Sequence, residues 1–153
     1  MADKILDRLA QQREATLETL DALTESQMDQ AVDDEWTVRD VLTHLLNAEE
    51  DHCRVIAVAV RGDMDSLPRT FNLDTHNQER LAARGALTLE DLRAALVAQR
   101  ERTTALYHRI DAEQLDMPVP HPALGETTVG KIFRIIGLHE KMHLKQITDV
   151  LGA

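Results

Sequence analysis

Aromatic residues are scarce in this sequence, at 3% of the chain, although hydrophobic residues make up 43% of it. The core must therefore be built mainly from aliphatic side chains. Six glycines and four prolines are too few for the turns that many short strands would need. Ala, Leu, Glu and Arg, which favour helices, outweigh the β-branched and aromatic residues that favour sheets. The composition predicts an all-α fold.

Basic charge is also scarce, because 17 Lys and Arg face 27 Asp and Glu, which gives a net charge of −10. No cluster of Lys or Arg is interleaved with aromatic residues, as nucleic-acid binding would need. The acidic excess disfavours anionic membrane surfaces, and no apolar run approaches the roughly 20 residues that cross a bilayer. We expect neither nucleic acid nor membrane as a partner.

The single cysteine, Cys53, cannot form a disulfide within the chain. The segment Met1-Ala2-Asp3-Lys4 leads straight into an amphipathic stretch without the apolar region of a signal peptide. Both features favour a reducing compartment, so we expect a cytoplasmic protein. With 153 residues and no internal repeat or linker, the chain is expected to form one domain over residues 1–153.

Hydrophobic periodicity and capping signals predict four long helices. Their expected ranges are 3–23, 37–61, 88–110, and from Thr127 or Thr128 to about 153. A shorter helix over 72–84, a short turn from Thr24, a loop over 62–70 and a stiff proline-rich connector over 117–122 complete the pattern. Four long helices with modest connections predict a four-helix bundle, whose neighbour order the sequence leaves open.

The last predicted helix contains the chemically most informative segment, His139-Glu140-Lys141-Met142-His143. At about 100° per residue, His139 and His143 lie one turn apart on the same face, where two imidazoles can bind one metal ion. Both fall within the apolar stripe of this helix, and Glu140 lies in the same sector. A buried carboxylate needs a partner, such as a metal-bound water, a metal-ligating imidazole or a cation.

The segment also matches the H-E-x-x-H pattern of zinc peptidases, in which the glutamate is the general base. Such enzymes need a third ligand, commonly downstream, but only ten residues follow His143. Gln146 and Asp149 stand where a metzincin has Gly and His, and no edge strand is evident to hold a peptide. A peptidase is therefore disfavoured.

The remaining histidines are candidates for a third ligand: His44, His52, His76, His108 and His121. On the second predicted helix, His52 is nearly central in the apolar stripe and His44 lies at its margin. Periodicity slightly favours His52 as the buried residue but does not choose the ligand. The two are about 12 Å apart along the helix, so they are not expected to bind the same ion.

Two segments resemble the motifs of the DinB/YfiT-like family. Residues 35–45, EWTVRDVLTHL, are similar to its second-helix signature, in which a histidine follows a Trp-Thr helix start. Residues 139–147, HEKMHLKQI, are similar to its fourth-helix pattern of H-x-x-x-H followed by Gln-Ile. The resemblance covers nearly the whole chain.

The resemblance implies an up-down-down-up four-helix bundle, often dimeric, with a metal held by His44, His139 and His143. It does not fix the metal; zinc is our first expectation, with nickel or iron as alternatives. Three protein ligands leave one coordination position open, as in catalytic zinc sites.

Some members of this family resemble S-transferases that use bacillithiol, mycothiol or a related thiol such as glutathione. We therefore expect a metal-dependent enzyme that activates a small thiol against a small electrophile, with Glu140 as a candidate proton acceptor. Asn47 and Asp51 are candidates to line the pocket. A hydrolase using metal-bound water and Glu140, or a non-catalytic metal-binding stress-response protein, remain alternatives.

Overall fold

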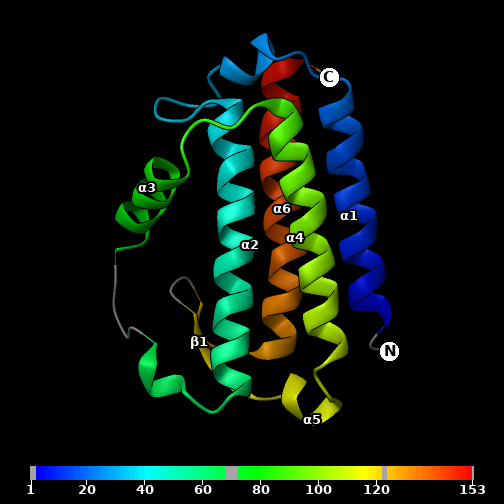
Figure 1. The fold of residues 1–153 in the computed structure, drawn as a ribbon, viewed down its shortest axis with the longest axis vertical. Coiled ribbons are helices and arrows are strands. Elements are labelled where there is room, and N and C mark those ends of the chain that lie inside the picture. The colour runs from blue at the N-terminus through cyan, green and yellow to red at the C-terminus, as the bar shows by residue number, and fades with distance from the viewer. Residues whose placement is uncertain (1–2, 68–71, 122–123, 153) are drawn as a thin grey trace.

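The computed structural model describes residues 3–67, 72–121 and 124–152. Four long helices form the body of the protein (Figure 1): α1 (Asp3–Asp21), α2 (Val38–Val60), α4 (Leu89–His108) and α6 (Val129–Leu151). In Figure 1, α1 and α6 run upward while α2 and α4 run downward. Helices α1 and α2 both pack against α4 and α6. The all-α prediction and the up-down-down-up four-helix bundle are therefore confirmed.

Three of the long helices, α2, α4 and α6, begin where local capping signals predict. Thr37 forms a capping box with Asp40 at the start of α2, and Thr88 accepts a hydrogen bond from the Asp91 amide at the start of α4. Thr128 caps α6 in the same way. Each cap satisfies a backbone N–H that has no partner within its helix.

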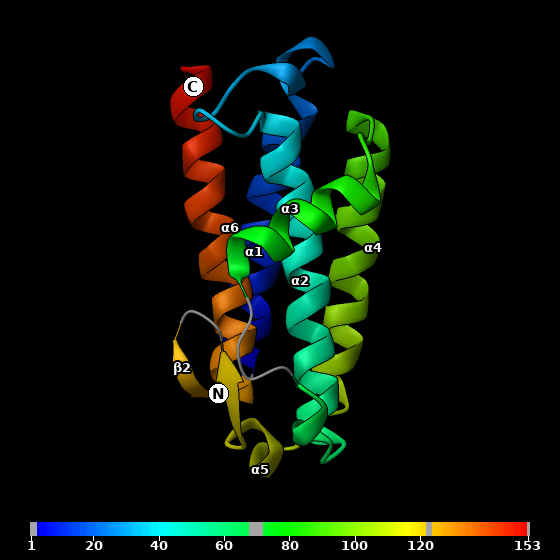
Figure 2. The same cartoon turned by 90° about the vertical axis from the view of Figure 1, so that its left-hand side faces the viewer.

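The connections contain short elements. Two 3₁₀ turns, η1 (Ser26–Asp29) and η2 (Met64–Ser66), follow α1 and α2, and the one-turn helix α5 (Ala112–Leu115) follows α4. Helix α3 (Leu73–Arg84) lies across the outside of α2, as Figure 2 shows. It buries no residue and is held by ion pairs, among them Arg80 to Glu50 at 2.8 Å.

The proline-rich stretch differs from the stiff connector that the sequence predicts. It forms strand β1 (Pro118–His121), which pairs antiparallel with β2 (Gly125–Thr128). A two-stranded hairpin leaves one edge of each strand unpaired, so prolines fit there without loss of a ladder hydrogen bond. Val119 anchors the hairpin, because its side chain is 1% exposed. The hairpin places His121 near α2.

The core consists of two apolar clusters at opposite ends of the bundle. One surrounds Phe133 and Tyr107, and the other surrounds Leu42 and Leu96. Between them, at mid-height, lies a layer of charged and hydroxyl side chains that all four long helices supply. We call this the polar layer; its members are Arg13, Thr16, Glu49, Arg100, Thr103 and Glu140.

Within the ranges that the structure describes, no helix combines the length and the apolar character that crossing a membrane would require.

Candidate metal centre

Three imidazoles from two helices meet between α2 and α6. His44 lies on α2, and His139 and His143 lie one turn apart on α6. The Nε2 atom of His139 is 3.1 Å from Nε2 of His44 and 3.0 Å from Nε2 of His143. The donor atoms of all three lie within 4.8 Å of one another, and no other set of three or more His, Cys, Asp or Glu donors in the described residues is grouped in this way.

These distances suit a shared metal ion. Two nitrogens that each lie about 2.1 Å from one ion are separated by about 3.0 Å at a right angle and about 3.4 Å at a tetrahedral angle. A direct hydrogen-bond network does not explain the arrangement, because one ring nitrogen carries either one hydrogen or one in-plane lone pair. Nε2 of His139 has two nitrogen neighbours, and a cation would satisfy all three lone pairs at once.

Neighbouring side chains orient two of the three rings. Nδ1 of His143 lies 2.7 Å from Oε1 of Gln146, so Nδ1 donates its hydrogen there and Nε2 presents its lone pair. The indole of Trp36 packs on the His44 ring, with ring centroids 4.9 Å apart. Trp36 directly precedes the N-cap residue of α2. Its contact with His44 therefore links the start of the helix to the position of that histidine.

The electrostatics keep the rings neutral. Burial, together with the neighbouring imidazoles, lowers the pKa of His44 to about 4 and that of His139 to about 2. Burial also lowers the pKa of His143, an effect that the bond to Gln146 opposes. Neutral imidazole is the form that ligates metals. His44 is buried, whereas His139 and His143 are half-buried, so solvent reaches one side of the centre.

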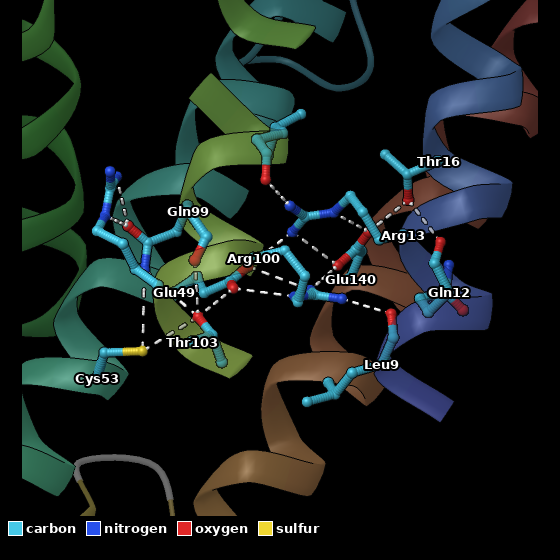
Figure 3. Close-up of polar contacts among 12 residues, drawn as sticks. Leu9, Gln12, Arg13, Thr16, Glu49, Cys53, Gln99, Arg100, Thr103 and Glu140 are labelled. Carbon is cyan, nitrogen blue, oxygen red and sulfur yellow. Dashed lines mark hydrogen bonds and ion pairs between the residues drawn. The ribbon is translucent and has the colours of Figure 1, made fainter. Parts of the chain in front are cut away.

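Glu140 does not take part in this centre, although the sequence makes it a candidate proton acceptor there. Its side chain is buried in the polar layer (Figure 3), where Oε2 accepts from Arg13 at 2.9 Å and from Thr16 at 2.6 Å. Oε1 accepts from Arg100 at 2.6 Å. The partner that a buried carboxylate requires is thus a cation, one of the options left open above, and these contacts favour a structural role for Glu140 over that of a proton acceptor.

Two other expected pocket residues are held by α3. Asn47 Oδ1 accepts from Arg84 at 3.1 Å, and Asp51 pairs with His76 at 2.8 Å. Both side chains therefore have partners outside the three-histidine centre. His108 lies exposed near the end of α4.

His52 and His121, considered singly from the sequence, form a pair. Their Nε2 atoms are 3.2 Å apart. The pairing was missed because the hairpin that carries His121 was not predicted. Gln146 was missed as the partner of His143, although the Gln-Ile that follows H-x-x-x-H in the resembling motif marks this position.

A family model, described as the DinB superfamily, matches residues 8–147. The chain belongs to the DinB superfamily. The resemblance drawn from residues 35–45 and 139–147 is therefore confirmed. Among DinB-related sequences, the uncharacterized protein YuaE of Bacillus subtilis (strain 168) is 27% identical over 150 residues, covering 90% of this chain and 93% of YuaE.

Solved structures agree with the DinB assignment. TT2238, a four-helix bundle protein, shares 26% identity with this chain at a TM-score of 0.72. The match covers 97% of this chain and 98% of TT2238. YfiT from Bacillus subtilis, described as a probable metal-dependent hydrolase, shares 21% identity with a TM-score of 0.74, covering 99% of this chain and 87% of its own. A mycothiol-dependent maleylpyruvate isomerase matches at 13% identity and a TM-score of 0.81, covering 96% of this chain but 60% of the isomerase. The last two show a shared fold.

Proposed function

We propose that this protein is a divalent-metal-dependent S-transferase that joins a small thiol to a small electrophile. The observation that carries the proposal is the position of the His139 Nε2 atom, within 3.1 Å of one imidazole nitrogen and 3.0 Å of another. Three neutral imidazoles would hold a divalent ion here, and that ion would lower the pKa of a thiol bound to it.

The residues of this chain have distinct tasks in such a reaction. His44, His139 and His143 would hold the ion, and Gln146 would fix the ring of His143 through the contact at its Nδ1. The half-buried rings of His139 and His143 mark the side from which substrate enters. The thiol proton leaves to solvent, the sulfur forms a bond to the electrophilic carbon, and the leaving group departs with its electron pair.

The fate of Glu140 favours transfer over hydrolysis. The hydrolase that the sequence suggested uses the carboxylate of Glu140 to take a proton from metal-bound water. Glu140 is committed to Arg13, Arg100 and Thr16 in the polar layer. Thiol activation at a metal needs no such base, because coordination alone favours the thiolate at neutral pH.

Zinc is the metal we propose first, with nickel or iron as alternatives that accept imidazole ligands. The similarity to YfiT and to the mycothiol-dependent isomerase supports metal dependence and thiol use only through their shared fold. A homodimer is also part of the proposal, since the resembling family is often dimeric.

The test begins with elemental analysis of protein purified without added metal. The metal-loaded protein is then assayed with bacillithiol, mycothiol and glutathione against electrophiles such as a chlorodinitrobenzene. We expect turnover that disappears with chelator and in His44→Ala, His139→Ala and His143→Ala. Metal binding without turnover of any pair would favour a non-catalytic protein, and hydrolysis that needs no thiol would favour the hydrolase.

A further inference from the structure

A second pair of histidines borders the three-histidine centre. His52 lies on α2, and His121 is the last residue of β1. Their Nε2 atoms are 3.2 Å apart, their ring planes differ by 16° and the ring centroids are 5.3 Å apart. The pair joins the hairpin to the bundle.

The geometry of this pair differs from that of the metal centre. The rings of His44, His139 and His143 are nearly perpendicular to one another, with interplanar angles of 78° to 89°. In the pair, near-parallel rings place one nitrogen opposite one nitrogen, as in a direct N–H···N hydrogen bond. No third metal-ligating atom groups with the pair in the described part of the chain. Among the described residues, the pair therefore does not belong to a second group of three metal-ligating side chains.

The pair lies beside the open centre and leaves one polar atom unused. The His52 ring lies 6.4 Å from the His139 ring, edge to face at 88°. Nε2 of His52 is engaged by His121, but Nδ1 is buried and has no hydrogen-bond partner among the described residues. A buried polar atom without a partner costs free energy, which a ligand supplying that partner would recover.

We propose that His52 hydrogen-bonds the polar part of the small thiol held at the three-histidine centre, and that His121 positions the His52 ring for this contact. This inference rests on the proposed function. Thiols built on cysteine carry an amide N–H and a carbonyl oxygen close to the sulfur. One of these groups complements Nδ1 in either tautomer of His52, because that nitrogen carries either a hydrogen or a lone pair. His52 thereby selects cysteine-derived thiols over simple alkyl thiols.

The experiment uses the cobalt(II)-loaded protein and two neutral probes, N-acetylcysteine methyl ester and 1-propanethiol. The thiolate-to-cobalt charge-transfer absorption reports the binding of each. We expect His52→Ala to weaken binding of the ester about three- to tenfold and to leave 1-propanethiol unchanged. His121→Ala should give a smaller loss of the same pattern, and His121→Asn, which keeps a hydrogen-bonding side chain, should restore part of it.

His108→Ala, at an exposed site on α4, is the matched control and should leave both affinities unchanged. The inference is overturned if His52→Ala affects both thiols equally or neither, or if it removes cobalt as His139→Ala does. If His52→Ala does not fold, His52→Gln is read by the same comparison. Cobalt binding without any thiol complex in the unaltered protein would refute the proposed function as well, and this outcome is recognised before any variant is made.

Discussion

Gln146 shows how one exposed side chain can orient a candidate metal ligand. Its amide oxygen takes the Nδ1 hydrogen of His143, so the opposite nitrogen of the ring is left with its lone pair. Partners of this kind typically contribute ten- to a hundredfold to metal affinity. We expect Gln146→Ala to weaken zinc binding by about tenfold, measured by competition with a chromogenic chelator.

Lys145→Ala is the matched control for Gln146→Ala, since Lys145 is exposed on the same helix and pairs with Asp149. It should leave the zinc affinity unchanged. Equal affinities for the two variants would show that Gln146 does not orient the ring.

Cys53 is the only thiol of the chain, and its surroundings make it inert. Burial raises its pKa to about 11, an effect that the contact with Thr103 opposes. In the proposed transferase reaction, we therefore expect the reactive sulfur to come from the substrate. We expect Cys53→Ala to retain transferase activity, and Cys53 to react slowly with Ellman's reagent at pH 8 in the folded protein. Loss of turnover in a folded Cys53→Ala variant would assign the nucleophile to the chain itself.

Acid should weaken the metal-free protein through the buried imidazoles. Burial lowers the pKa of His44 from 6.5 to about 4. Between these two pH values the unfolded chain therefore binds a proton at His44 that the folded chain does not bind. The stability contribution is present above pH 6.5 and is lost as the pH falls from 6.5 towards 4. Urea unfolding across this range should show a falling free energy of unfolding, with a shallower slope for His44→Ala. Parallel slopes would contradict this assignment.

At the scale of the elements, helix starts were predictable and long-range pairings were not. Thr37 and Thr88 cap their own helices, so the signal and the structure lie within a few residues of each other. The spacing of His139 and His143 is local in the same sense. The hairpin depends on pairing Pro118 with Thr128, further along the chain, and proline content alone does not indicate this pairing.

Hydrophobic periodicity could not identify the third histidine of the centre, for a geometric reason. The ring of His139 lies 4.9 Å from that of His44 and 6.4 Å from that of His52, so α6 passes close to both residues of α2. A helical wheel treats each helix alone and does not contain this relation. The motif resemblance named His44, and the structure brings His44 together with His139 and His143.

The polar layer gives a prediction for the contacts of α6 with α1 and α4. Glu140→Gln would leave the buried guanidiniums of Arg13 and Arg100 with one carboxylate, that of Glu49. Breaking a buried ion pair in this way costs about 3–5 kcal/mol. We expect a loss of this size in the free energy of urea unfolding.

Asp149→Asn, which breaks the exposed pair with Lys145 on the same helix, is the control for Glu140→Gln. It should cost less than about 1 kcal/mol. A Glu140→Gln protein that is as stable as the control but inactive would return Glu140 to the chemistry.

At the scale of the whole molecule, the metal should bind only the folded chain. Its proposed ligands come from α2 and α6, which meet only in the assembled bundle. Zinc at a hundredfold excess over its Kd should stabilise the fold by about 2.7 kcal/mol. For a domain of this size the midpoint of thermal unfolding should rise by roughly 5–10 °C. Differential scanning fluorimetry with zinc or chelator measures this, and an equal rise in His139→Ala would place the ion elsewhere.

The polar layer has a mechanical consequence for the bundle. Apolar contacts are non-directional, so they specify the axial position of a helix less strictly than paired charges do. Here an axial shift of any long helix would separate a guanidinium, a carboxylate or a hydroxyl from its partner in the buried interior. The unpaired buried group would cost free energy that no new contact offsets. The layer thus fixes the axial register of the helices. It holds His44 level with His139 whether or not an ion is bound.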